Sequence, residues 1–148
     1  MEVFTMPVRK GFAEWKGDLK KGSGTLGTET GILKDVTYNF VSRFETGRNT
    51  NPEELLGAAH AACYSMALAG AVSGAGFKVN SVRTEDTVHI EKQGEGFSIT
   101  RIDIFTEASV EGINEETFLK LAEDTKKNCP VSKALSNTPM VLKAVLKG

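Results

Sequence analysis

The sequence has few cysteines and no excess of charge, and both scarcities restrict what the protein can be. Only two of the 148 residues are cysteine, Cys63 and Cys129. A chain of this length builds its own core, so two thiols do not indicate a disulfide scaffold. The 18 basic and 19 acidic residues give a formal net charge of −1. This balance leaves no electrostatic footprint for nucleic acid or for an anionic membrane.

Long apolar runs and targeting signals are also missing. The most apolar stretch, residues 55–72, contains glycine, histidine and serine and follows two glutamates, so we expect it to be too polar and too short to span a bilayer. Met1 to Thr5 lack a basic stretch followed by an apolar run, which predicts no secretory signal. We therefore expect a soluble protein of the reducing cytoplasm. Neither a repeat nor a linker interrupts residues 1–148, which are predicted to form one domain.

The order of predicted elements indicates an α+β fold. The first 44 residues are predicted to form antiparallel strands separated by glycine-rich turns, and residues 36–44 alternate as one strand on which Arg43 faces away from Tyr38 and Phe40. A helix is expected from Asn51 to about residue 73. A β-hairpin over residues 79–110, a second helix from near Asn114 and a strand over residues 139–147 follow.

The central helix has the clearest signals of any element. Asn51 suits the N-cap, Pro52 suits the first helical position, and Glu54 stands where a capping-box partner should. The helix is apolar nearly all round, which predicts burial on several sides.

Each thiol has two interpretations: it is reactive, or it is purely structural, as a small buried hydrophobic side chain. Cys129 directly precedes Pro130. If Pro130 begins a short helix, Cys129 lies near its N-cap, where free amides favour a thiolate, but the same residues also suit a simple turn. Cys63 lies inside the central helix and would need a cation to become reactive. Arg43 and Arg48 are the candidates for that cation.

His60 stands three residues before Cys63 and shares its helical face. Zinc binding is a minor hypothesis, because the chain has two histidines, two cysteines and no Cys-x-x-Cys pair. His60 could also act as a general base to Cys63, but no orienting third group is evident and the spacing rarely aligns such a pair. A packing or capping role is favoured, and we expect neither a metal nor a cofactor.

Several motifs together resemble the family of osmotically inducible protein C (OsmC) and organic hydroperoxide resistance protein (Ohr). Residues 50–68, TNPEELLGAAHAACYSMAL, resemble the central-helix signature of that family, and CPVS at residues 129–132 resembles its second motif. The resemblance extends to WKGDLK at residues 15–20, GTLGTETG at 24–31 and SRFE at 42–45. These N-terminal segments are more similar to the OsmC branch.

The resemblance implies a thiol-dependent peroxidase that reduces organic hydroperoxides in stress defence, built as an intertwined homodimer around a long buried helix. By position, Cys63 matches the peroxidatic cysteine, Cys129 the resolving cysteine, Arg43 the activating arginine and Glu53 its carboxylate partner. A dithiol, possibly of a lipoyl protein, would supply the electrons. A non-catalytic thiol sensor or binding protein is the alternative, and repeated turnover would distinguish the two.

Spacing adds an expectation about the site. Glu53 and Cys63 are ten residues apart, or about 15 Å along one helix, too far to serve one site from the same chain. Two copies of the helix that cross antiparallel near Ala58 would bring Glu53 of one chain level with Cys63 of the other. The small residues of this stretch, Gly57 among them, would allow the close approach.

Overall fold

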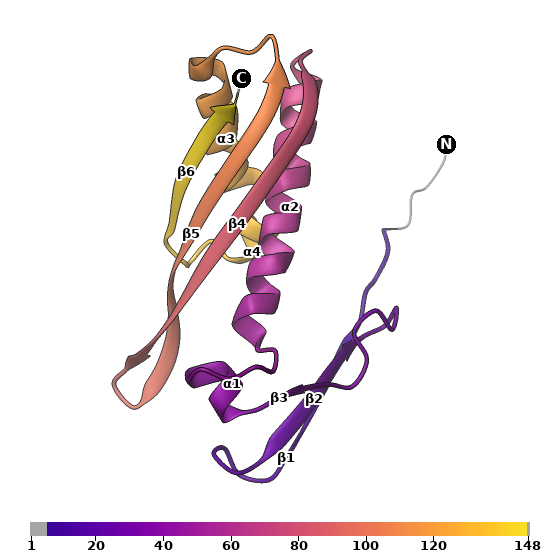
Figure 1. Cartoon of the computed structure of the whole chain (residues 1–148), viewed down its shortest axis with the longest axis vertical. Coiled ribbons are helices and arrows are strands. Elements are labelled where there is room, and N and C mark those ends of the chain that lie inside the picture. The colour runs from indigo at the N-terminus through magenta and orange to yellow at the C-terminus, as the bar shows by residue number, and fades with distance from the viewer. Residues whose placement is uncertain (1–5, 148) are drawn as a thin grey trace. The chain divides into compact units, whose positions relative to one another are not determined.

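The computed structural model describes residues 6–147 and divides the chain into two units, Met1–Pro52 and Glu53–Gly148. Met1 to Thr5, where we expect no secretory signal, lie outside the described residues. Each unit is described by itself (Figure 1). The single domain over residues 1–148 stays a prediction.

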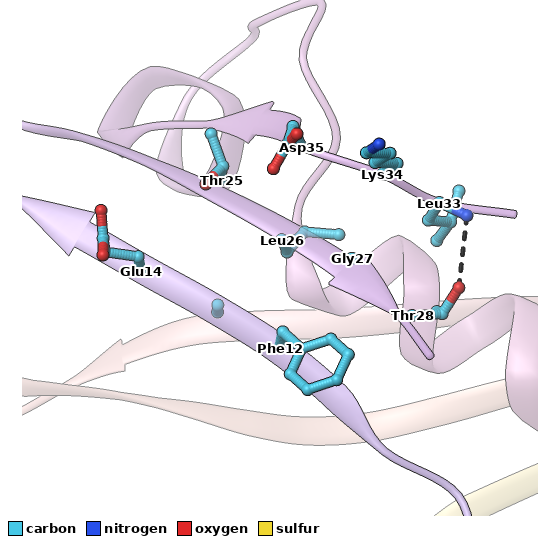
Figure 2. A pocket seen from close by; sticks show the side chains of 10 residues that line it. Phe12, Glu14, Thr25, Leu26, Gly27, Thr28, Leu33, Lys34 and Asp35 are labelled. Carbon is cyan, nitrogen blue, oxygen red and sulfur yellow. Dashed lines mark hydrogen bonds between the residues drawn. The ribbon is translucent and has the colours of Figure 1, made fainter. Parts of the chain in front are cut away.

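The first unit holds a three-stranded antiparallel sheet in the order β1-β2-β3, from β1 (Gly11–Lys16), β2 (Ser23–Thr28) and β3 (Val36–Tyr38). Trp15 and Tyr38 pack with their ring centroids 5.4 Å apart. A hollow of about 410 Å³ opens over β1 and β2, and the amide of Leu33 donates to the hydroxyl of Thr28 at its rim (Figure 2). The ten residues that line this hollow include no thiol or imidazole, so it is not the candidate site.

The strand predicted over residues 36–44 is wrong beyond Tyr38. The chain turns at Asn39 into a short helix, α1 (Phe40–Phe44), which carries Arg43. Asn39 accepts a hydrogen bond from the Ser42 amide at 2.8 Å, and the Ser42 hydroxyl accepts one from the Asn39 amide at 2.9 Å. This reciprocal capping box satisfies amides that the helix start leaves unpaired, so a local polar pair overrides the alternating apolar pattern.

The second unit begins with the central helix, α2 (Pro52–Gly74), close to the predicted bounds. One side of α2 is buried, at Glu53, Gly57, His60, Tyr64, Leu68 and Val72. Another side is exposed within this chain, including Ala58, Ala62, Met66 and Gly70, so burial on several sides is not found in the single chain. A Cβ added to Gly57 would lie 3.3 Å from the Val88 side chain, so Gly57 allows α2 to pack closely on a strand of its own unit.

The length of α2 also corrects an expectation about membranes. With 23 residues, α2 is long and apolar enough to cross a bilayer by length and composition, so our description of this stretch as too short and too polar was wrong. Core helices of soluble proteins meet the same criterion. The buried side of α2 is packed within its own unit, where Tyr64, Leu68 and Val72 belong to the hydrophobic core.

A sheet in the order β4-β5-β6 forms the rest of the core with α2 and α3 (Figure 1). The predicted hairpin is confirmed as β4 (Lys78–Gln93) and β5 (Gly96–Glu111), joined through Gly94, whose φ of 61° suits glycine. Alternate residues of β5 are buried against α2 and α3 (Glu115–Asn128). The Tyr64 hydroxyl donates to the Ala122 carbonyl at 2.8 Å, which links the two helices.

The last elements are α4 (Pro130–Ala134) and β6 (Met140–Lys147). The strand β6 pairs with β5 in parallel, so α3 and α4 form the crossover between them. The helix α3 starts near Asn114 as predicted, and the Asn114 side chain caps it by accepting a hydrogen bond from the Thr117 amide at 2.8 Å. The α+β architecture is therefore confirmed.

Candidate active site

Cys129 stands at the junction of α3 and α4. It is the N-cap of α4, Pro130 follows it in the first helical turn, and its sulfur accepts a hydrogen bond from the Ser132 amide at 3.3 Å. The sulfur also lies 3.2 Å from the Ser132 hydroxyl. Of the two interpretations of Asn-Cys-Pro, the helix N-cap is therefore the one that the structure contains.

The surroundings of Cys129 favour its thiolate. Only 1% of the residue is exposed, and this burial alone would raise its pKa. The pKa of the Cys129 thiol is nevertheless lowered, and the hydroxyl and amide of Ser132 make the largest contributions against burial. A hydrogen bond from Cys63 and the charge of His60 act in the same direction.

Cys63 lies halfway along α2 and is half-buried. Burial raises the pKa of the Cys63 thiol, and the hydrogen bond and charge of Cys129 raise it further, while the backbone at Val131 partly opposes them. The fold thus brings the two thiols close enough to shift each other's pKa across 66 residues of sequence. Within the second unit these neighbours stabilise the thiolate at Cys129 and not at Cys63.

His60 is fully buried and both of its ring nitrogens have partners. Nε2 lies 2.7 Å from the Ser132 hydroxyl, and Nδ1 is paired with the Asp86 carboxylate on β4. Burial works against the charged imidazole, but the hydrogen bond and charge of Asp86, together with those of Cys129, raise the pKa of His60. Sequence reasoning found no third group to orient His60, and that was wrong, because Asp86 orients it from 26 residues away.

These contacts also bear on the zinc hypothesis. Both nitrogens of His60 are engaged by Asp86 and Ser132, so neither is directed at an open metal position. Among residues 6–147 we find no group of three or more His, Cys, Asp or Glu side chains that could hold a metal ion.

Arg43 and Glu53 fall in different units. Arg43 lies in α1 of the first unit, where its guanidinium is 5.1 Å from the centre of the Phe44 ring and borders a hollow of about 250 Å³ with Trp15 and Tyr38. Glu53 lies in the first turn of α2 and is 6% exposed. The pairing of Arg43 with Glu53 and with Cys63 stays a prediction.

Known proteins are similar in sequence to most of this chain. Peroxiredoxin OsmC of Escherichia coli (strain K12) is 47% identical to this chain over 127 residues, which cover 86% of this chain and 89% of the relative. Peroxiredoxin OsmC of Shigella flexneri gives the same values.

Solved structures share the fold at lower identity. An OsmC-like protein of unknown function from Vibrio cholerae has a TM-score of 0.72 at 16% identity and covers 95% of this chain and 100% of its own. The organic hydroperoxide resistance protein OhrB of Bacillus subtilis has a TM-score of 0.64 at 22% identity, over 93% and 98% of the two chains. The model of the family described as OsmC-like protein matches residues 45–143. On these similarities, the chain belongs to the OsmC-like protein family.

Proposed function

We propose that this protein is a thiol-dependent peroxidase that reduces organic hydroperoxides by forming a disulfide between Cys63 and Cys129. The peroxidase class is that of the relatives named peroxiredoxin OsmC, to which the chain is 47% identical over most of its length. The observation that carries the proposal is the contact of His60 with Ser132, which holds α2, the helix of Cys63, against α4, which Cys129 caps. Cys63 is half-buried and Cys129 is fully buried.

Accessibility assigns the two roles. A peroxide must reach the attacking sulfur, and Cys63 is half-buried while Cys129 is 1% exposed. The Cys63 thiolate attacks one oxygen of the hydroperoxide, the O–O bond breaks, and the departing alkoxide takes up a proton to become an alcohol. Cys63 is left as a sulfenic acid.

Cys129 then resolves this intermediate. Its thiolate attacks the sulfur of the Cys63 sulfenic acid, an S–S bond forms, the S–O bond breaks, and hydroxide leaves as water after protonation. A dithiol reductant, such as a lipoyl group, exchanges with the disulfide and returns both thiols while it becomes a disulfide itself. The cycle needs no metal or cofactor.

Among the described residues of its unit, no cation lowers the pKa of the Cys63 thiol. Burial and Cys129 both raise the pKa of the Cys63 thiol, so its thiolate must be stabilised from elsewhere. We assign this task to Arg43, which stays charged when partly desolvated, and we assign Glu53 to hold the guanidinium in place.

The proposal includes a homodimer. Glu53 and Cys63 lie about 15 Å apart on α2, so one arginine cannot serve both from one copy of the helix. Ala58, Ala62, Met66 and Gly70 form an exposed apolar stripe on α2, and Met66 is 81% exposed. A second α2 that crosses antiparallel near Ala58, at the first residue of this stripe, would bring the partner's helix start level with Cys63. We place this dimer in the cytoplasm, where reductants keep the thiols available.

A turnover experiment tests the function. The reduced protein is given cumene hydroperoxide, a fatty-acid hydroperoxide or hydrogen peroxide, with a lipoyl or a thioredoxin system as reductant. We expect many equivalents of organic hydroperoxide to be consumed per chain. Consumption of a single equivalent, with the reductant system intact, would support a redox sensor in place of a peroxidase.

A further inference from the structure

An unbroken chain of hydrogen bonds runs from Cys129 into the core. The Cys129 sulfur lies 3.2 Å from the Ser132 hydroxyl, which lies 2.7 Å from Nε2 of His60, and Nδ1 of His60 pairs with Asp86. The groups come from α4 and its N-cap, from α2 and from β4. Cys129, Ser132 and His60 are each at most 4% exposed, and the side chain of Asp86 is fully buried.

A gain in folding stability does not by itself explain these linked hydrogen bonds. Buried ion pairs are often no more stabilising than well-packed apolar residues of the same volume. Among the described residues none gives a hydrogen bond to the second oxygen of Asp86, Oδ1, which is also buried. A buried acceptor left in this way costs free energy. The core therefore holds the pair of His60 and Asp86 at a cost in free energy, and Ser132 links this pair to the Cys129 thiol.

We propose that Ser132, His60 and Asp86 are positioning residues that remove the proton from Cys129 and hold it while Cys129 resolves the Cys63 sulfenic acid. This inference rests on the proposed peroxidase cycle and adds to it three residues and the route of one proton. It gives the buried resolving thiol its own base, separate from the arginine assigned to Cys63.

The hydrogen bonds can run in either direction, which is what a proton relay requires. With neutral His60, the Cys129 thiol donates to Ser132, the Ser132 hydroxyl donates to Nε2, and Nδ1–H donates to Asp86. When the proton moves, Nε2 takes the Ser132 proton and Ser132 takes the Cys129 proton. Imidazolium then donates to Ser132, and Ser132 donates to the thiolate. Every donor keeps an acceptor in both states.

The proton balance also closes over the resolving step. Cys129 gives up one proton before its attack, and the hydroxide that leaves Cys63 takes up one proton to become water. The imidazolium holds one proton in the interval and releases it afterwards, so His60 ends neutral. Asp86 accepts the hydrogen bond from Nδ1–H in both states and stabilises the imidazolium, as in hydrolytic Ser-His-Asp sites.

Electrostatics within the cluster agree with this direction of transfer. Burial opposes both charged forms, yet Asp86 raises the pKa of His60 and Ser132 lowers the pKa of Cys129. The other titratable groups that face the cluster are Cys63 and Tyr64 from α2, and Glu123 from α3 acts on Tyr64. Burial and these neighbours raise the pKa of Tyr64 far above neutrality, so the phenol stays protonated.

Ser132, His60 and Asp86 are hydrogen-bonded one to the next like the Ser, His and Asp of a hydrolytic triad. Their surroundings nevertheless indicate thiol chemistry. The Ser132 hydroxyl is buried and directed at the Cys129 sulfur, so no open position beside it can receive an ester or amide. His60 thus acts as a base toward Cys129, and the Ser132 hydroxyl passes the proton between them.

The first test needs no peroxidase activity. In Cys63→Ser the only remaining thiol is Cys129, and its ionisation is followed by the ultraviolet absorbance of the thiolate. We expect His60→Gln, Asp86→Asn and Ser132→Ala, each in this background, to move the titration to higher pH. His89→Gln and Asp103→Asn are the matched controls, because His89 and Asp103 form the other His–Asp pair, 2.8 Å apart on the exposed part of the sheet. An unchanged titration in folded Ser132→Ala would overturn the relay.

The second test separates the two chemical steps in a single turnover with cumene hydroperoxide. In Ser132→Ala and His60→Gln we expect disulfide formation to slow by roughly tenfold to a hundredfold at neutral pH, while peroxide attack at Cys63 changes less than about twofold. The Cys63 sulfenic acid should then accumulate and react with a dione probe, and higher pH should restore the rate. Equal slowing of both steps at every pH would indicate a structural role and refute the proposal. If the wild-type protein forms neither a Cys63 sulfenic acid nor a Cys63–Cys129 disulfide, the peroxidase cycle fails, whatever the first test shows.

Discussion

The Ser132 hydroxyl lies 2.7 Å from Nε2 of His60, although 72 residues separate them in the chain. Each residue stands three positions from a cysteine, with Cys63 after His60 on α2 and Cys129 before Ser132 at the cap of α4. Residues three apart on a helix share a face, so this single contact aligns the two faces that carry the thiols. The buried hydrogen bond therefore holds α4 against α2 at the point where the disulfide is proposed to form.

The assigned roles of the thiols predict different failures when each is removed. Cys63→Ser should abolish turnover, since a hydroxyl at this site is not activated as a thiolate is. Cys129→Ser should reduce one equivalent of hydroperoxide and then stall or become over-oxidised, because the sulfenic acid lacks its resolving partner. Burst kinetics with mass spectrometry of Cys63 measures both outcomes. The roles are reversed if Cys63→Ser keeps the first equivalent and Cys129→Ser loses it.

Arg43→Ala should raise the pKa of the Cys63 thiol and slow peroxide attack by about tenfold or more at neutral pH. The reason is that burial and Cys129 both disfavour the Cys63 thiolate, so its stabilisation depends on an added cation. Thiolate absorbance in Cys129→Ser, with and without Arg43→Ala, measures the effect on one thiol. Arg48→Ala is the control and should change neither quantity. An unaltered titration in Arg43→Ala would remove this residue from the site.

Shared sites predict rescue between two inactive chains. Glu53→Ala and Cys63→Ser chains are mixed, and the heterodimers are isolated by tags. If Glu53 serves the partner's cysteine, each heterodimer has one site with both lesions and one intact site, so about half of the wild-type activity per dimer should return. Absence of rescue in verified heterodimers would show that Glu53 and Cys63 serve the same chain.

The exposed stripe on α2 predicts how the dimer can be broken. Met66 is 81% exposed, so Met66→Lys should leave each chain folded and weaken dimerisation by about tenfold or more, because it places a charge in the apolar contact. Val141→Lys is the control, since Val141 is another exposed apolar side chain, on β6. Analytical ultracentrifugation over a dilution series measures both. Equal dimerisation constants for the two variants would exclude this stripe as the contact.

The capping box at Asn39 predicts a local effect on the element that carries Arg43. Asn39→Ala should cost about 1 kcal/mol of α1 stability and raise amide exchange in residues 40–44, while Asn39→Asp should restore most protection. Asn114→Ala removes the equivalent cap of α3 and should leave exchange in α1 unchanged. Equal rates of amide exchange in α1 in all three variants would contradict the role of Asn39.

Local signals and distant contacts explain what could be predicted from the sequence. The start of α2 at Pro52 and the cap at Cys129 were predictable, because proline and polar caps act on adjacent residues. The helix α1 was missed, since the Asn39 and Ser42 cap is hidden within an alternating apolar pattern. Asp86 was missed for a different reason. It looks like one more acidic residue on a strand, and only the register of β4 beside α2 brings it to His60.

The two partners of His60 also determine when its hydrogen bonds can form during synthesis. Chains are made from the N-terminus, and Asp86 and Ser132 follow His60 by 26 and 72 residues. A nascent chain that ends before α4 therefore contains the helix and its imidazole but lacks the hydroxyl that satisfies Nε2. The elements α3 and α4 belong to the crossover that lets β6 pair in parallel with β5. The two thiols can thus meet only after α4 has been made, so Cys63 waits through the synthesis of β4, β5 and α3 before its partner arrives.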